Sequence, residues 1–215
     1  MRSASLTALS AGLASLGIAG CAMLGAASPL FPTKASVQRF DFERDTLHQP
    51  PEGFDAHGGQ WSVVDSPTAT SGTQVLVRGD DSVGLLAVKE AEGVTAAGGE
   101  VQVRVFLGSS GAGLSCSSSK NGGGHVLKLE ANATRVALYR EADGSMKVVD
   151  EYPAPVPKGE WARIGIRCDS DRVIGYLDGK PVVRDRSTTS AFDLALYADA
   201  GVTAQFDDLS YWANK

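Results

Sequence analysis

The chain has 215 residues, a formal net charge of −5, 25 glycines and only 7% aromatic residues. Its mildly acidic character argues against nucleic acid as a partner, because nucleic-acid-binding surfaces carry a basic excess. Abundant glycine and few aromatic residues favour a turn-rich, all-β protein over a helical bundle.

The first 20 residues have the pattern of a secretory signal peptide. Arg2 is their only charge, an apolar stretch follows, and small residues come directly before Cys21. A cysteine here resembles the lipobox of bacterial lipoproteins, in which the thiol receives a diacylglyceryl group and cleavage occurs before it. We therefore expect a signal peptide over residues 1–20 and lipid attachment at Cys21. Two alternatives stay open, an ordinary cleaved signal and a retained anchor helix over Leu6–Met23, although small and polar residues dilute that stretch.

Residues 21–36 contain Pro29, Pro32 and several small residues, a composition typical of a flexible tether. Strand signals begin at Val37, so we expect the folded domain to cover residues 37–213. The lipobox resemblance implies a bacterial envelope protein, held in membrane lipid through Cys21. We expect the protein to be a monomer. The absence of aspartate at position 22 favours the outer membrane in organisms that use that sorting rule.

Segments in which apolar and polar residues alternate recur through the domain. In Glu100–Val105, for example, every second residue is valine. Such alternation predicts strands with one buried and one solvated face. The other predicted strands are Trp61–Val64, Gln74–Arg78, Leu85–Lys89, Leu114–Cys116, Val126–Glu130, Arg135–Arg140, Met146–Tyr152, Ala162–Arg167, Val173–Leu177, Pro181–Asp185, Asp193–Tyr197 and Thr203–Tyr211. Many short strands without a three-turn amphipathic helix predict an all-β, two-sheet antiparallel sandwich.

Asp-Gly pairs mark two predicted hairpins. Asp178-Gly179 and Asp143-Gly144 each lie between two predicted strands and supply the positive φ angles of a type I′ turn. Two stretches rich in glycine and serine, 108–113 and 117–124, have few apolar side chains to bury, so we expect them to be mobile loops.

The chain has three cysteines. If Cys21 carries lipid, Cys116 and Cys168 remain in an oxidising compartment, where a disulfide persists. Both are in phase with the apolar residues of their strands, so we expect them to pair within the core. Two separate buried thiols are the alternative, because pairing requires the Cα atoms to lie within about 7 Å of each other.

A series of short motifs follows a recognisable order along the domain. They are Phe40–Glu43 (FDFE), Gly59–Val63 (GQWSV), His125–Asn132 (HVLKLEAN), Arg135–Arg140 (RVALYR), Trp161–Ile166 (WARIGI), Leu177–Lys180 (LDGK) and Phe206–Leu209 (FDDL). In this order they resemble bacterial laminin-G-like, concanavalin A-like (jelly-roll) sandwich domains, which are often grouped with 3-keto-disaccharide hydrolase and family 16 glucanase-like domains. The resemblance implies a sandwich from about Phe40 to Tyr211, but it does not fix the function, because such sandwiches include lectins, glycosidases, lyases and adhesive modules. The chain departs from it at Gly122–His125, where relatives often carry aromatic residues.

We find no catalytic motif in the sequence. A family 16-like glucanase needs carboxylates on one strand face, and the nearest approximation is Glu141-Ala142-Asp143, which runs into a predicted turn. A Gly-x-Ser-x-Gly nucleophile elbow is absent. We therefore predict no catalytic residue, and enzymatic activity stays uncertain.

Metal and cofactor sites have little support in the sequence. His48 and His57 lie in a segment rich in proline and glycine, and we interpret them as exposed loop residues rather than metal ligands. Asp41, Asp207 and Asp208 would meet if the first and last strands paired, and they would then offer oxygen ligands for a structural Ca²⁺ ion. A charged sheet edge that blocks aggregation is the favoured interpretation, so we expect no cofactor.

Arg104, Lys128, Arg140 and Arg163 fall out of phase with the core, and we expect them to contact a ligand together with Tyr139. His125 is the sixth candidate, because its place beside the glycine-rich stretch would let it line the rim of such a site. On one concave sheet they would bind a glycan through guanidinium forks and aromatic stacking, whereas scattered solubilising charges are the alternative. We therefore predict a non-catalytic carbohydrate- or envelope-binding module. The alternatives are a glycosidase or keto-disaccharide hydrolase-type enzyme and a purely structural or adhesive module.

Overall fold

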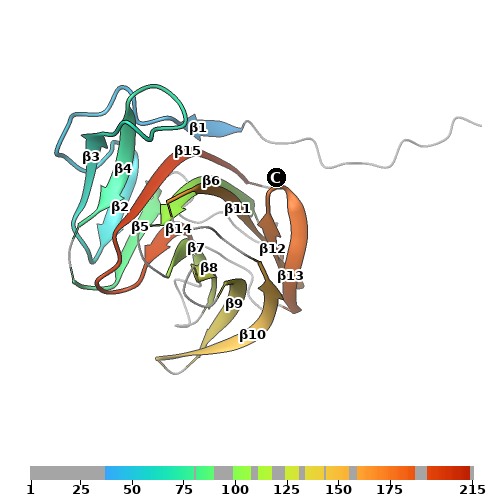
Figure 1. Ribbon diagram of the computed structural model, residues 1–215. Helices are drawn as coiled ribbons and strands as arrows, with labels where there is room; N and C mark the ends of the chain where they lie inside the picture. Colours follow the sequence, from blue (N-terminus) through green and yellow to red (C-terminus); the bar gives the residue numbers. More distant parts are fainter. Residues whose placement is uncertain are drawn as a thin grey trace, which may run out of the picture. The chain divides into compact units, whose positions relative to one another are not determined.

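The computed structural model describes residues 37–79, 81–89, 99–107, 111–117, 124–130, 134–142, 144–154, 159–186 and 193–213. Every named secondary-structure element in these ranges is a β-strand, and all the strand pairs between neighbours are antiparallel (Figure 1). Cys21 lies outside the described residues, as do the predicted signal peptide and tether. No helix in the described ranges is long and apolar enough to cross a membrane.

The strands form two sheets. The eight-stranded sheet has the order β13 (Lys180–Arg186), β12 (Arg172–Leu177), β11 (Trp161–Cys168), β6 (Gly99–Leu107), β15 (Ala204–Ala213), β4 (Gln74–Arg78) and β3 (Trp61–Asp65), with β1 (Gln38–Phe40) also paired to β15. The seven-stranded sheet has the order β10 (Ser145–Pro153), β9 (Arg135–Ala142), β8 (Gly124–Glu130), β7 (Ala112–Ser117), β14 (Asp193–Ala198), β5 (Gly84–Val88) and β2 (Phe54–His57). This is the antiparallel jelly-roll sandwich expected from the sequence.

The two sheets bury a common hydrophobic core. Along β6, Val101, Val103 and Val105 are fully buried, while Gln102 and Arg104 alternate with them on the outer face. The same core contains side chains from the seven-stranded sheet, such as Leu114 on β7 and Leu127 on β8. Burial of alternate residues from both sheets in one cluster is what holds a sandwich together.

A disulfide joins the sheets through this core. Cys116 on β7 and Cys168 on β11 are fully buried, with Cα atoms 6.7 Å apart, and their sulfur atoms are bonded. The predicted pairing is therefore confirmed. The bond connects a central strand of one sheet to an inner strand of the other, across 52 positions of sequence.

The predicted strands are confirmed, with small shifts at their ends. The Asp178-Gly179 hairpin is also confirmed: both residues have positive φ, at 49° and 75°, and Leu177 pairs with Lys180 across the turn. Gly144 likewise has a positive φ between β9 and β10, whereas Asp143 lies outside the described residues.

One strand lies where the sequence predicted a loop, and another begins inside a predicted loop. β2 contains His57, which the proline and glycine around it led us to assign to a loop; the strand pairs with β5 at the sheet edge, and His57 is exposed. β7 begins inside the glycine- and serine-rich stretch. A Cβ atom on Gly113 would lie 1.8 Å from the Leu127 carbonyl oxygen, so this glycine allows two strands to approach rather than making a loop.

The outer face of the central strands of the seven-stranded sheet is buried as well, whereas the edge strand β10 is mostly exposed. Val126, Ala137, Tyr139 and Tyr197 form a second hydrophobic cluster there, with Leu85 packed against it. Alternation had predicted a solvated outer face for every strand, and for these central strands that expectation is wrong. The eight-stranded sheet, in contrast, has an open outer face that carries a groove.

Candidate functional site

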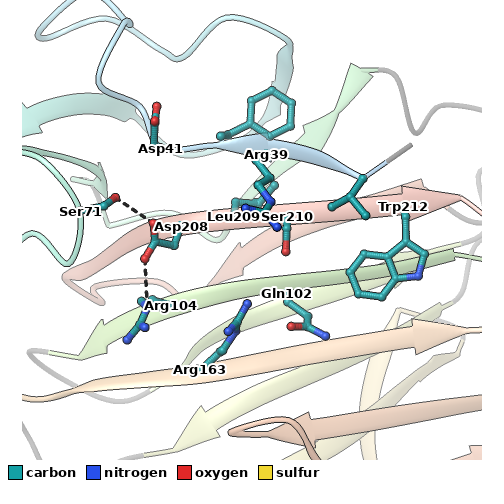
Figure 2. Close-up of a pocket in the computed structure, with 12 residues that line it drawn as sticks. Arg39, Asp41, Ser71, Gln102, Arg104, Arg163, Asp208, Leu209, Ser210 and Trp212 are labelled. Atoms are coloured by element: carbon teal, nitrogen blue, oxygen red, sulfur yellow. Dashed lines mark hydrogen bonds and ion pairs between the residues drawn. The ribbon is translucent and has the colours of Figure 1, made fainter. Parts of the chain in front are cut away.

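The groove has a volume of about 630 Å³. It is lined by Val37, Arg39, Phe40, Asp41, Ser71, Gln102, Arg104, Arg163, Asp208, Leu209, Ser210 and Trp212. Because cationic side chains and one indole dominate its polar lining, we call it the Arg–Trp groove. Figure 2 shows the Arg104–Asp208 pair at one end and Trp212 at the other, with Gln102 and Arg163 between them.

Strand register explains why this surface is hollow. Arg39 on β1 pairs with Ser210 on β15, Ser210 pairs with Gln102 on β6, and Gln102 pairs with Gly165 on β11. Cross-strand neighbours lie about 4.8 Å apart, so this row spans four strands and about 14 Å. Ser210 within the row and Gly165 at its β11 end rise little above the sheet. The longer Arg39 side chain stands at one edge of the row.

A bulge in β15 shapes one end of the groove. The register shifts between Asp207 and Ser210, and Asp208 has a φ of 50°. The fully buried Asp207 carboxylate accepts the Thr70 amide at 2.7 Å and the Ser71 amide at 3.1 Å. The bulge thereby ties the loop before β4 to the last strand.

The bulge also turns Asp208 toward the groove. Its carboxylate accepts the Ser71 hydroxyl at 2.8 Å and pairs with the Arg104 Nε at 3.0 Å. Arg104 lies opposite Arg163 in the β6–β11 register. Two guanidinium groups are thus adjacent at this end, and one of them is neutralised by Asp208.

The other two arginines of the groove are available to a ligand. Arg39 and Arg163 are exposed, and neither side chain has a hydrogen-bond or ion-pair partner among the described residues. Asp208, Ser210 and Trp212 occupy successive outward positions along β15, a length of about 13 Å. The surface therefore offers guanidinium donors beside an aromatic ring over the length of a short oligosaccharide.

The candidate residues from the sequence do not share one sheet face, which corrects the expected arrangement. Only Arg104 and Arg163 lie in the Arg–Trp groove. Lys128 and Tyr139 lie on the outer face of the seven-stranded sheet, and the other two candidates, His125 and Arg140, lie at an edge where the sheets meet. The alternation gave the phase of each residue along its strand but could not assign the strand to a sheet.

Lys128 is held within a satisfied polar cluster. Its Nζ lies 3.2 Å from the Asp199 carboxylate and 4.2 Å from the centre of the Tyr139 ring. Glu130 accepts the Tyr139 hydroxyl and pairs with Arg135. Burial and the bond to Glu130 raise the pKa of Tyr139 to about 12. Since these groups already satisfy each other and are mostly buried, this cluster is a weaker candidate for ligand binding than the groove.

His125 and Arg140 connect the two sheets. The His125 Nε2 lies 2.9 Å from the Asp185 carboxylate on β13, and Arg140 bonds the same carboxylate. His125 is only 4% exposed, so the expectation that it lines a rim is wrong. Burial lowers the pKa of His125, Asp185 opposes that shift, and Arg140 adds to it. This trio closes an edge of the sandwich.

The first and last strands do pair, which was the condition for the acidic cluster, and the pairing brings Asp41 and Asp208 to the same groove. Asp207 and Asp208 are nevertheless engaged by Thr70, Ser71 and Arg104. Within the described ranges, no group of three or more histidine, cysteine or acidic residues is placed to hold a metal ion.

Sequence reasoning missed Arg39, Gln102, Ser210 and Trp212 as groove residues. Gln102 was visible as an outward position in the alternation of β6. Arg39 and Trp212 lie near opposite ends of the domain sequence, on β1 and β15. The sequence did not predict that these two strands pair, and only their pairing brings both residues to the groove.

The chain matches no protein-family model and no curated protein. Its fold is similar to solved structures of carbohydrate-related proteins. Carbohydrate-binding module CBM66 from Bacillus subtilis is 15% identical, with a TM-score of 0.58 over 79% of this chain and 99% of the module. The Crh5 transglycosylase in complex with NAG is 13% identical, with a TM-score of 0.59 over 84% of this chain and 85% of that one. Lectin II from Ulex europaeus is 9% identical, with a TM-score of 0.55 over 85% of this chain and all of the lectin. At these identities the likeness establishes the concanavalin A-like sandwich fold.

Proposed function

We propose that the protein is a non-catalytic carbohydrate-binding module that binds glycan in the Arg–Trp groove. The observation that carries the proposal is the combination of two unpartnered guanidinium groups, Arg39 and Arg163, with the Trp212 indole in one open groove. Sandwiches of this fold that bind carbohydrate support the assignment.

The groove has the two kinds of group that sugar recognition requires. Guanidinium forks donate several hydrogen bonds in a fixed plane, which suits the hydroxyl groups of a sugar. An indole face packs against the apolar C–H face of a sugar ring and adds buried area at little entropic cost. Gln102 and Ser210, between Arg39 and Trp212 in the lining, add amide and hydroxyl groups.

Binding is favoured over hydrolysis because of the state of the groove carboxylates. Retaining glycosidases need two carboxyl groups about 5–5.5 Å apart, each able to contact the substrate. Asp208 is already engaged by Arg104 and Ser71. It therefore serves to orient Arg104.

We further propose that lipid on Cys21 holds the protein in the bacterial cell envelope, in the outer membrane. The support is the sequence pattern of residues 1–21. Metabolic labelling with a palmitate analogue should mark the wild-type protein and leave Cys21→Ser unlabelled and released from membranes. Equal labelling of both would refute the anchor.

Glycan binding is tested by screening the full-length protein in detergent against an array of neutral and acidic oligosaccharides. Trp212→Ala should bind more weakly than the wild type, whereas Arg184→Gln, an exposed position on β13 outside the groove, should retain wild-type binding. If the folded wild-type protein binds no glycan, the proposal fails and a structural or adhesive role takes its place. Hydrolysis of the bound sugars would instead favour an enzyme.

A further inference from the structure

The Arg–Trp groove is cationic, whereas the chain as a whole is acidic. The protein carries a formal net charge of −5. The groove has three arginines, Arg39, Arg104 and Arg163, and two acids, Asp41 and Asp208. It is therefore a local cationic site on an acidic protein, and such a site concentrates anionic ligands by focusing the field.

The arginines of the groove differ in whether an acidic side chain neutralises them. Arg104 is neutralised by Asp208 at 3.0 Å. Arg39 and Arg163 have no acidic partner among the described residues. The Asp41 carboxylate accepts a local hydrogen bond from the Glu43 amide at 3.3 Å, at the end of β1. The groove thus presents two guanidinium groups without an ion-pair partner among the described residues, and its three arginines and two acids leave one net positive charge.

These two groups approach the groove from different strands. Arg39 extends from β1 over Ser210, and Arg163 extends from β11 beside β6 (Figure 2). Two strands, β15 and β6, separate their backbones, a width of about 14 Å between β1 and β11. Two long side chains that start from strands at this separation line the same groove, together with Gln102 from the strand between them.

We infer that the groove selects glycans that contain an acidic sugar residue, whose anion is held between Arg39 and Arg163 while its ring contacts Trp212. This inference rests on the proposed glycan-binding function and names its ligand class. The shared chemistry is an oxyanion with at least two acceptor oxygens, which guanidinium groups bind through parallel, charge-assisted hydrogen bonds. A uronic acid carboxylate and a sulfate ester both provide it.

The test measures affinities by calorimetry for the full-length protein in detergent. The probes are oligogalacturonides, carboxyl-reduced oligosaccharides of the same length, sulfated galactose oligomers and poly-glutamate. The wild-type protein should bind an acidic oligosaccharide about 10- to 100-fold more tightly than the reduced one, as expected for one or two charge-assisted hydrogen bonds. The carboxylate and sulfate probes identify which anion the groove prefers.

Matched variants locate the effect. Arg39→Gln and Arg163→Gln should each reduce the preference for acidic over reduced sugar, and the double variant should abolish it. Arg184→Gln removes the same charge outside the groove and should leave the preference unchanged. All three positions are exposed, so the folded state is not at risk.

The possible failures are distinguishable. Equal wild-type affinity for acidic and reduced sugars would overturn the acidic preference and leave glycan binding intact. Equally tight binding of poly-glutamate would also overturn it, since attraction to any polyanion would then explain the result. If no sugar of either kind binds, the proposed function itself is wrong.

Discussion

Removing the disulfide between Cys116 and Cys168 should destabilise the domain by about 4 kcal/mol. The bond closes a loop of 52 residues. A cross-link over that separation removes about 14 cal/mol/K of chain entropy from the unfolded state, which corresponds to about 4 kcal/mol at room temperature. A domain of ordinary stability unfolds with about 5–15 kcal/mol, so the loss would be a large share of the total.

Urea unfolding of the wild type and of the Cys116→Ala/Cys168→Ala double variant, followed by tryptophan fluorescence, gives the difference directly. Reduced wild-type protein is the control: it should lose a similar amount, because both changes remove the same cross-link and the alanines remove little buried volume. A loss below about 1 kcal/mol in both samples would refute the reasoning, and would mean that the unfolded chain is already constrained without the bond.

The other predictions concern the bulge, the sheet edge and the groove. Asp207→Asn places an amide group against the Thr70 and Ser71 N–H groups, and should lower the free energy of unfolding by about 1–3 kcal/mol; an unchanged urea midpoint would argue against it. The wild type should become less stable as pH falls below about 6.5, because burial lowers the pKa of His125 and the unfolded chain then binds more protons there than the folded protein. Asp185, whose pKa is also lowered, contributes stability that is lost only at more acidic pH. His125→Gln should therefore flatten the dependence of the unfolding free energy on pH near neutral pH. If the variant keeps the pH dependence of the wild type, His125 is not its source. Trp212→Ala should weaken glycan binding by about 10- to 30-fold in calorimetry at unchanged thermal stability, whereas equal affinities would exclude stacking on this ring.

The fold was predictable because its signals are local. The alternation in Glu100–Val105 specifies which side chains of β6 face the core, and the Asp178-Gly179 pair specifies a tight turn between β12 and β13. β2 escaped prediction because proline and glycine surround it, and because the strand with which it pairs in the described part of the chain, β5, lies some distance further along the sequence. Gly113 misled for a related reason: glycine serves loops and close strand contacts alike.

The site was only partly predictable because it depends on contacts between distant residues. Arg104 and Arg163 were correctly seen as outward-facing, and the β6–β11 pairing brings them together. Lys128 has the same kind of pattern, yet it lies over a buried aromatic cluster on the other sheet. Sequence phase cannot separate these cases, since the strand order of each sheet decides which surface a residue joins.

One edge of the groove rests on a short strand. β1 contains three residues, Gln38–Phe40, and among the described strands it pairs with β15 alone. So few backbone pairs give β1 a lower local unfolding free energy than the strands at the centre of the sheet. A ligand that contacts Arg39 therefore binds only the fraction of molecules in which β1 is docked, and its apparent dissociation constant rises as that fraction falls. By linkage, a bound ligand protects β1 from opening. Ligand binding in the groove and docking of β1 on β15 are therefore coupled equilibria.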